Sequence, residues 1–66
     1  MHTYLVTAEV WDEDNPRTPK RTIDLTVERE TSEGLHEAVG TILTEDESLE
    51  HMSFLAHEIV RMERVS

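Results

Sequence analysis

The chain contains no cysteine, few glycine, proline or aromatic residues, and few basic side chains. Without Cys it can form neither a disulfide nor a thiolate metal site. The core of so small a chain supplies only about 3–5 kcal/mol of stability, so good packing or self-association must support it. No hydrophobic run approaches the roughly 18 residues of a membrane span, and the N-terminus lacks the basic segment of a signal peptide. These absences predict a cytoplasmic protein without a membrane segment.

At 66 residues the chain is long enough for one small domain, which we predict to span residues 1–66. This length excludes a Rossmann enzyme, a (β/α) barrel and a kinase-like catalyst. A water-excluding active site of several hundred cubic ångströms would also consume much of the core. We therefore predict a protein that is not an enzyme and that holds no cofactor and no metal.

The composition is strongly acidic, with 15 Asp and Glu against 6 Lys and Arg and a formal net charge of -9. Acidic chains that are poor in aromatic residues are often disordered. In this chain, however, the apolar residues recur with the periods of strands and helices, which is typical of a folded domain.

Two segments alternate hydrophobic and polar residues with the period of a β-strand. In residues 3–11 the even-numbered positions are all hydrophobic, and in residues 21–29 Ile23, Leu25 and Val27 share one face. The connecting segment contains two prolines, which interrupt both helices and strand ladders. We therefore predict a long antiparallel hairpin.

A helix is predicted after the hairpin, because five apolar residues share one face at helical spacing. These residues are Leu35, Ala38, Val39, Ile42 and Leu43. Thr31 or Ser32 can cap the helix, and Glu33 lies in the predicted first turn, where the macrodipole favours an anion. Gly34 and Gly40 each cost a helix up to about 1 kcal/mol relative to Ala, so this helix depends on docking against the sheet.

In the remaining third of the chain, the residue pattern predicts a short second helix or helical turn over residues 44–54 and a third strand over residues 57–65. The alternation in the third strand allows either face to lie inward. Together these elements predict a small α+β domain, a ββαβ layer with one helix packed on a three-stranded, mainly antiparallel sheet.

No motif in the sequence establishes a reaction. Residues 57–61 begin as a zincin helix does, but Arg61 occupies the position of the second His ligand. The acidic residues 12–14 resemble the start of a calcium loop that lacks its required Gly, and a loose cation site there remains an alternative. Glu33 and His36 have the spacing of carboxylate-bridged metal proteins but fall on the polar face of the predicted helix.

Eleven of the fifteen acidic residues fall into three groups, in the hairpin loop, from the second strand to the outer helix face, and at the helix exit. The groups are Asp12, Glu13 and Asp14; Glu28, Glu30, Glu33 and Glu37; and Glu45, Asp46, Glu47 and Glu50. Glu33 and Glu37 are like charges four residues apart on the predicted helix, which costs a few tenths of a kcal/mol that folding does not require. Solubility is one explanation of the charge, and a basic partner is another.

The sign of the charge argues against direct nucleic-acid binding, which needs a basic stripe. DNA carries one negative charge per about 1.7 Å of duplex axis, so the proteins that bind it display long basic grooves. A small acidic protein can occupy such a groove with electrostatically steered association and an apolar anchor. The predicted partner-binding residues are Trp11, Asp12, Glu13, Asp14, Glu33, Glu37, Glu45, Asp46, Glu47 and Glu50.

In size, acidity, absence of Cys and strand–helix–strand layout, the whole chain resembles the small inhibitors encoded by phages and mobile elements, including the anti-CRISPR proteins. These families share a strategy rather than a motif. The resemblance implies a stoichiometric inhibitor that docks on a basic, DNA-binding surface of a host nucleoprotein complex and blocks recognition of target DNA. Both DNA mimicry and steric blocking fit this role, as do a monomer and a homodimer.

Two rival functions also fit the sequence. One is an antitoxin-like or regulatory dimer, in which strand edges pair between subunits and the acidic face neutralises a basic toxin. The other is a metal-dependent activity that uses carboxylates and histidines. Molecular mass in solution separates a dimer from a monomeric inhibitor, and calorimetry with divalent cations tests the metal-dependent alternative.

Overall fold

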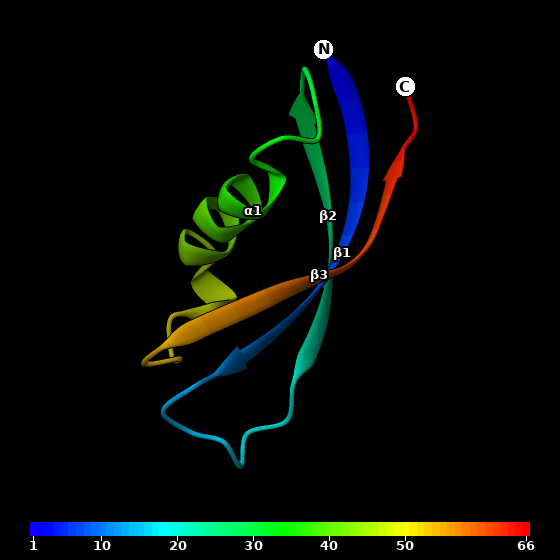
Figure 1. Cartoon of the computed structure of the whole chain (residues 1–66). Helices are drawn as coiled ribbons and strands as arrows, with labels where there is room; N and C mark the ends of the chain where they lie inside the picture. Colours follow the sequence, from blue (N-terminus) through cyan, green and yellow to red (C-terminus); the bar gives the residue numbers. More distant parts are fainter.

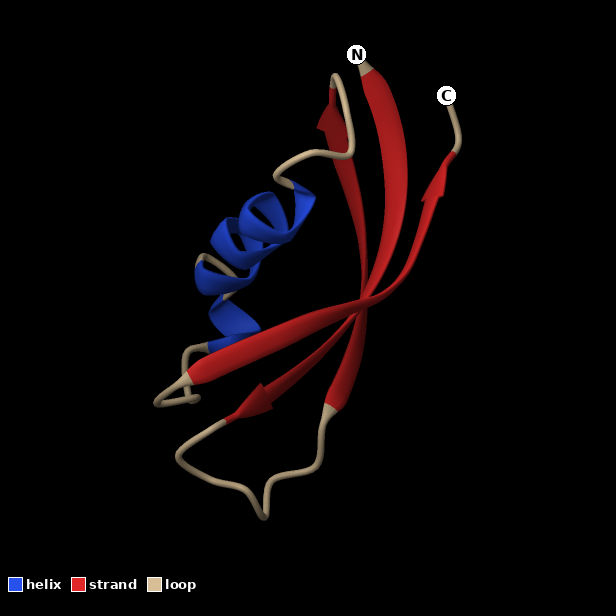
Figure 2. Cartoon of the chain, viewed as in Figure 1, coloured by secondary structure: helices blue, strands red, loops and turns tan.

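The computed structural model describes all 66 residues and contains three strands, one α-helix and one short 3-10 helix (Figures 1 and 2). The elements are β1 (His2–Asp12), β2 (Arg21–Arg29), α1 (Leu35–Thr44), η1 (Glu47–Leu49) and β3 (Leu55–Arg64). β1 is the central strand of one antiparallel sheet of order β2-β1-β3. The predicted α+β class, with one helix on a three-stranded antiparallel sheet, is confirmed.

The order of the strands requires the chain to cross the sheet between β2 and β3. Because both strands pair antiparallel with β1, they run in the same direction as each other. Strands that run the same way need a long connection, usually a helix. That connection contains α1, which lies on one face of the sheet and leaves the opposite face open (Figure 2).

The core lies between α1 and the face of the sheet formed by the even-numbered residues of β1. Val6, Ala8 and Val10 on this face are at most 1% exposed, and Val39 and Leu43 of α1 are fully buried against them. The strand alternation and the helical spacing therefore predicted this interface, except that Ile42 of the predicted apolar helix face is 38% exposed. Only 11 of the 66 residues are buried, so each core side chain carries a large share of the stability.

The start of α1 differs from the sequence prediction. Gly34 occupies the N-cap with a φ of 72°, and no side chain caps the helix. The Thr31 hydroxyl accepts instead from the backbone N–H of Glu33 at 3.2 Å, in the turn before the helix. The predicted cap at Thr31 or Ser32 is wrong, because a left-handed Gly34 ends the turn and lets α1 begin at Leu35. Glu33 consequently lies outside the helix. Glu33 and Glu37 therefore do not form the predicted pair of like charges four residues apart on a helix.

β3 pairs with β1 in two registers that are separated by a bulge. Ala8 lies opposite Ile59 and Thr7 lies opposite Arg61, so Val60 is the extra residue. The bulge shifts the alternation by one position. On the side of α1, odd-numbered residues precede the bulge and even-numbered residues follow it, which explains why the sequence alternation fitted either face.

Gly40 allows β3 to approach α1 closely. A Cβ atom at Gly40 would lie 3.0 Å from Cε1 of His57. The ring of His57 stacks on the ring of His36, with centroids 4.1 Å apart and planes at 22°. The Nε2–H of His57 also donates to the carbonyl oxygen of His36 at 3.1 Å. The glycine that weakens the helix therefore makes room for a histidine that joins helix and sheet.

This packing predicts that Gly40 and His57 are energetically coupled. Gly40→Ala should gain nearly the full helix propensity of about 1 kcal/mol in a His57→Ala background, where the space is open. In the unaltered chain the gain should be smaller or reversed, since the methyl group displaces the stacked ring. Urea unfolding of the four proteins measures the coupling. Equal gains in both backgrounds would show that the ring does not constrain position 40.

Candidate acidic interaction site

Asp12 joins the hairpin loop to the turn that precedes β3. Asp12 is 3% exposed, and its carboxylate accepts a hydrogen bond from the side-chain amide of Asn15 at 2.8 Å. It also accepts from three backbone N–H groups, those of Asp14 at 3.0 Å, Ser53 at 3.0 Å and Phe54 at 3.1 Å. All four donors favour the charged form, so the carboxylate is fully engaged within the chain.

These bonds change both the acidity and the role of Asp12. The hydrogen bond from the Asn15 side chain lowers the pKa of Asp12 most, and the backbone donors Ser53, Phe54 and Asp14 lower it further against the effect of burial, to about 2. A contact between Asp12 and a partner stays a prediction, but the observed bonds direct its carboxylate into the chain. A buried carboxylate that accepts from four donors positions the loop, so we leave Asp12 out of the interaction surface described below.

Because Asp12 links these segments, two of the predicted acidic groups lie at the same end of the molecule. The backbone N–H of Glu13 donates to the carbonyl oxygen of Phe54 at 2.9 Å, which brings the loop beside the η1 region (Figure 1). We name this surface the acidic end. It comprises Glu13, Asp14, Glu45, Asp46, Glu47 and Glu50, all exposed except the half-buried Asp46.

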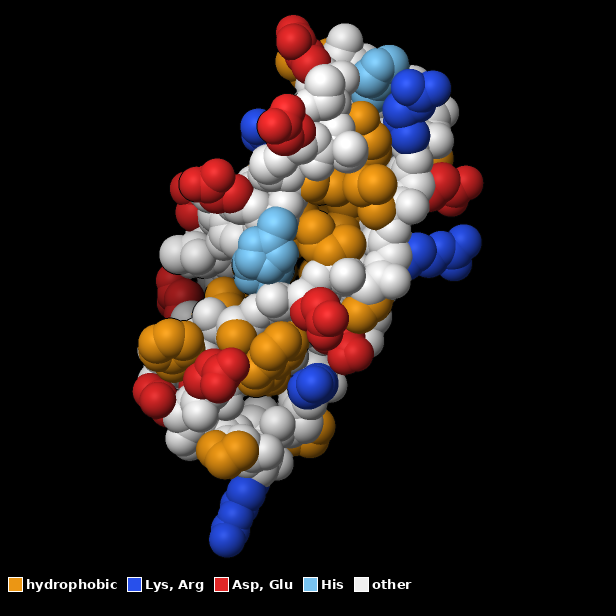
Figure 3. All heavy atoms as spheres, in the orientation of Figure 1, with side chains coloured by type: hydrophobic (Ala, Val, Ile, Leu, Met, Phe, Trp, Pro, Cys, Tyr) orange, Lys and Arg blue, Asp and Glu red, His pale blue; other side chains and the backbone are white.

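An apolar side chain, Phe54, lies within the acidic end and is 57% exposed. It borders an open groove of about 510 Å³ that is also lined by Leu49, Met52 and Glu50. Figure 3 shows acidic and hydrophobic side chains together over this end, on the side of α1. Phe54 is not among the predicted partner-binding residues, because the single Trp was the predicted anchor. The sequence does contain a signal for this residue, because Phe54 is a single aromatic side chain that closely follows the acidic segment 45–50.

Two of the acidic residues occupy helix ends. Asp46 is the N-cap of η1 and accepts from the hydroxyl of Ser48 at 2.8 Å and from its backbone N–H at 2.9 Å. These bonds, the side-chain one first, lower the pKa of Asp46, and the charge of Arg21 contributes in the same direction. Glu45 is the C-cap of α1, where the helix macrodipole disfavours a negative charge. Asp46 thus has a structural role, whereas Glu45 opposes the stability of its own helix.

Trp11 lies on the opposite face of the sheet from α1. Its indole N–H donates to the carboxylate of Glu13 at 3.0 Å, and the ammonium group of Lys20 lies 4.7 Å from its ring centroid. Glu33 and Glu37 are exposed near the start of α1, at the other end of the helix from the acidic end. The predicted residues therefore form no single patch, and only the loop and helix-exit groups are brought together.

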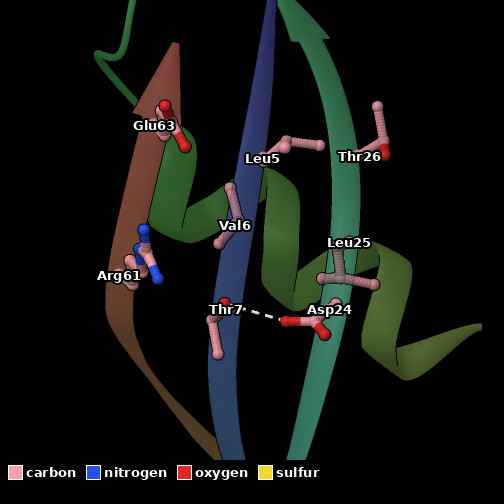
Figure 4. A pocket seen from close by; sticks show the side chains of 8 residues that line it. All are labelled: Leu5, Val6, Thr7, Asp24, Leu25, Thr26, Arg61 and Glu63. Carbon is pink, nitrogen blue, oxygen red and sulfur yellow. Dashed lines mark hydrogen bonds between the residues drawn. The ribbon is translucent and has the colours of Figure 1, made fainter. Parts of the chain in front are cut away.

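The open face of the sheet carries a second hollow, of about 410 Å³, shown in Figure 4. Its rim mixes Asp24, Arg61 and Glu63, and the hydroxyl of Thr7 donates to Asp24 at 2.8 Å. No three His, Asp or Glu side chains converge as a metal ion requires. None of the helices has the length and apolarity needed to cross a bilayer.

Comparisons with protein-family models, with curated proteins and with solved structures gave no match. The description of the site therefore rests on the geometry of this chain.

The bonds to Asp12 predict a loss of stability in acid. Its pKa is lower in the folded state, at about 2, than the ordinary value of 3.8. The contribution of Asp12 to the free energy of unfolding, which is fully present above about pH 4, should therefore be lost as the pH falls toward about 2. The reason is that the unfolded chain takes up the proton at a higher pH than the folded chain. Asp12→Asn should lower the urea midpoint at neutral pH and flatten this acid dependence.

Asp14→Asn provides the matched control for this prediction, because the Asp14 side chain is exposed and in the same loop. It should leave the urea midpoint and its pH dependence nearly unchanged. If both variants behave alike, Asp12 does not hold the loop through its carboxylate.

Proposed function

We propose that the chain is a stoichiometric, non-catalytic inhibitor that binds a basic, nucleic-acid-binding surface of a host complex through its acidic end. The observation that carries the proposal is the group of exposed carboxylates around Phe54, defined above as the acidic end. This role resembles that of anti-CRISPR proteins, which block recognition of target DNA. Under this proposal the protein acts in the cytoplasm of the host cell and needs no cofactor.

The mean charge density of the whole chain is closer to that of one nucleic-acid strand than to that of a duplex. The longest extent of the chain is 37 Å, close to one turn of B-DNA at about 34–36 Å. Nine net negative charges over that length give one charge per about 4 Å. A duplex carries one charge per about 1.7 Å of axis, and a single strand one per about 3.4 Å. The protein therefore approaches the charge spacing of a single strand.

The hydrogen-bond partners of the acidic residues also support an external role for their charge. Within the acidic end, side chains donate only to Glu13 and Asp46, and the donors, Trp11 and Ser48, are neutral. Neutral donors leave the negative charge in place, so the field of the acidic end extends into solvent. Such a field raises the rate of association with a basic surface.

The groove beside Phe54 suits a basic side chain of the partner. Lys and Arg carry long apolar stems below their charged heads, and such stems pack on apolar surface while the heads reach polar groups. A guanidinium group also stacks favourably on an aromatic ring. With Leu49 and Met52 in the groove and Glu50 at its edge, the site offers both the apolar contact and the countercharge.

Charge reversal at the acidic end should weaken binding to the partner. The partner is first isolated with the tagged chain, and displacement of its DNA is then measured. Changing Glu45, Glu47 and Glu50 to Lys should reduce affinity by at least about tenfold, because repulsion replaces attraction. Binding of the unaltered chain should weaken as salt rises from about 50 mM to about 500 mM, because exposed charges are screened.

A second triple variant, with Glu28, Glu30 and Glu33 changed to Lys, is the matched control. Each triple variant changes the net charge by six, from -9 to -3, but the control residues lie away from the acidic end. Affinity should be largely retained in the control. Equal losses would assign binding to net charge alone, and no loss in either would rule out the electrostatic mechanism.

The C-cap position of Glu45 predicts that stability and binding respond in opposite directions. Glu45→Lys should raise the free energy of unfolding by about 0.3–1 kcal/mol, because a cation complements the C-terminal end of the helix dipole. The same variant should bind the partner less tightly. Urea unfolding and the binding assay test the two effects separately. A variant that loses stability would show that Glu45 contributes to the fold in some other way.

A further inference from the structure

The C-terminal half of β3 differs in charge from the rest of the chain. Residues 59–65 contain two Arg and one Glu, a net charge of +1, whereas the whole chain carries -9. The same segment contains Val60, Met62 and Val65, which are 49%, 45% and 48% exposed. Figure 3 shows hydrophobic atoms exposed between α1 and this part of β3. It is the one stretch of strand that combines exposed apolar residues with the opposite sign of charge.

β3 is an edge strand, and half of its backbone groups face an unpaired edge. The N–H of Val65 donates to the carbonyl oxygen of Thr3 at 2.9 Å, so the odd-numbered residues after the bulge bond to β1. In an antiparallel ladder the bonding groups of alternate residues point to opposite sides. The N–H and C=O groups of Met62 and Arg64 therefore point toward the open edge. An edge of this kind is a template for pairing with another strand.

We propose that this edge pairs with the same edge of a second copy of the chain, antiparallel and around a two-fold axis at Met62. The pairing makes a continuous six-stranded sheet with β3 of each copy at its centre. Such a contact is isologous, so every interaction in it occurs twice and the assembly closes as a dimer. The proposal concerns the protein alone and does not depend on the proposed function.

Charge complementarity selects this register among the registers that the backbone allows. With the axis at Met62, Arg61 lies opposite Glu63 of the second copy, and Glu63 lies opposite Arg61 of the second copy. An axis at Arg61, Glu63 or Arg64 would instead place that charged residue against its own copy. Like charges directly opposite each other destabilise a sheet, whereas opposite charges stabilise it. The register at Met62 is therefore the one with two ion pairs and no like-charged pair.

The side chains in this register are placed to interact. Arg61 and Glu63 both project on the sheet face away from α1, from neighbouring odd-numbered positions of β3 (Figure 4). Within the chain Arg61 lies opposite Thr7, and Glu63 lies opposite Leu5, so neither has an oppositely charged cross-strand partner. On the other face, Met62 meets its own copy. The pairing thus satisfies two charges and covers exposed apolar surface.

The other edge of the sheet does not offer a comparable self-pairing. In β2 an antiparallel pairing centred on Leu25 would place Arg21 against Arg29 of the second copy. A centre at Asp24 would place that carboxylate against itself, and a centre at Thr26 would place Asp24 against Glu28. Centres at Ile23 and Val27 avoid like-charged pairs, but no register centred on a β2 residue places a basic side chain of the strand opposite an acidic one. The sequence of the two edges therefore favours a closed dimer through β3 over an open chain of copies.

Analytical ultracentrifugation from about 1 µM to about 1 mM, a range that covers weak and moderate association, tests the proposal. The expected species at high concentration has twice the 7.7 kDa of the monomer. Arg61→Glu and Glu63→Arg should each weaken dimerisation about tenfold or more, because each replaces two attractive pairs with two repulsive pairs. The double variant, with both charges exchanged, should restore association.

Glu28→Arg on the opposite edge makes the same charge change as Glu63→Arg and should leave the dimer intact. Met62→Lys provides a second test that does not depend on the charge pairs, because a lysine at a strand edge opposes pairing. It should give a monomer whose circular dichroism is unchanged. A chain that stays monomeric at high concentration, a double variant that fails to restore the dimer, or an equal effect of Glu28→Arg would overturn the proposal.

Discussion

The structure depends on the burial of one face of β1. This strand is central, so both other strands bond to it, and the even-numbered side chains of its inner face form the floor on which α1 packs. Asp12 continues the same alternation to the end of the strand, but its carboxylate meets backbone donors in place of apolar atoms. The interface that forms the core therefore also fixes the turn before β3 and, through it, the acidic end.

The placement of charge conflicts with stability at several points, and the conflict supports a functional origin. Glu45 opposes the dipole of α1 at its C-cap, and no basic residue lies in the last turn. Across β1 and β3, Glu9 lies directly opposite Glu58, a like-charged pair that a sheet disfavours. A domain with so few buried residues gains nothing in stability from these arrangements. A basic partner would relieve them by neutralising the charge.

The fold places an acidic surface and a basic, apolar surface on different parts of the molecule. The acidic end gathers residues from the hairpin loop and from the segment around η1, with Phe54 among them. The C-terminal half of β3 is locally basic and apolar and borders the open side of the sheet. Because the two surfaces lie on different parts of the molecule, self-pairing at the edge leaves the acidic end free. A dimer would then present two acidic ends to a partner or to two partners.

The sequence by itself determined the elements and the inner face of the first strand, since both follow from periods of two and 3.6 that each segment carries locally. It also determined the sign of the charge, on which the proposed class of partner rests. Only the tertiary structure decided that Asp12 is buried, since its four donors come partly from residues more than 40 positions away. The bulge at Val60 likewise arises from pairing with β1. Local patterns cannot encode such contacts, because they form only when distant segments meet.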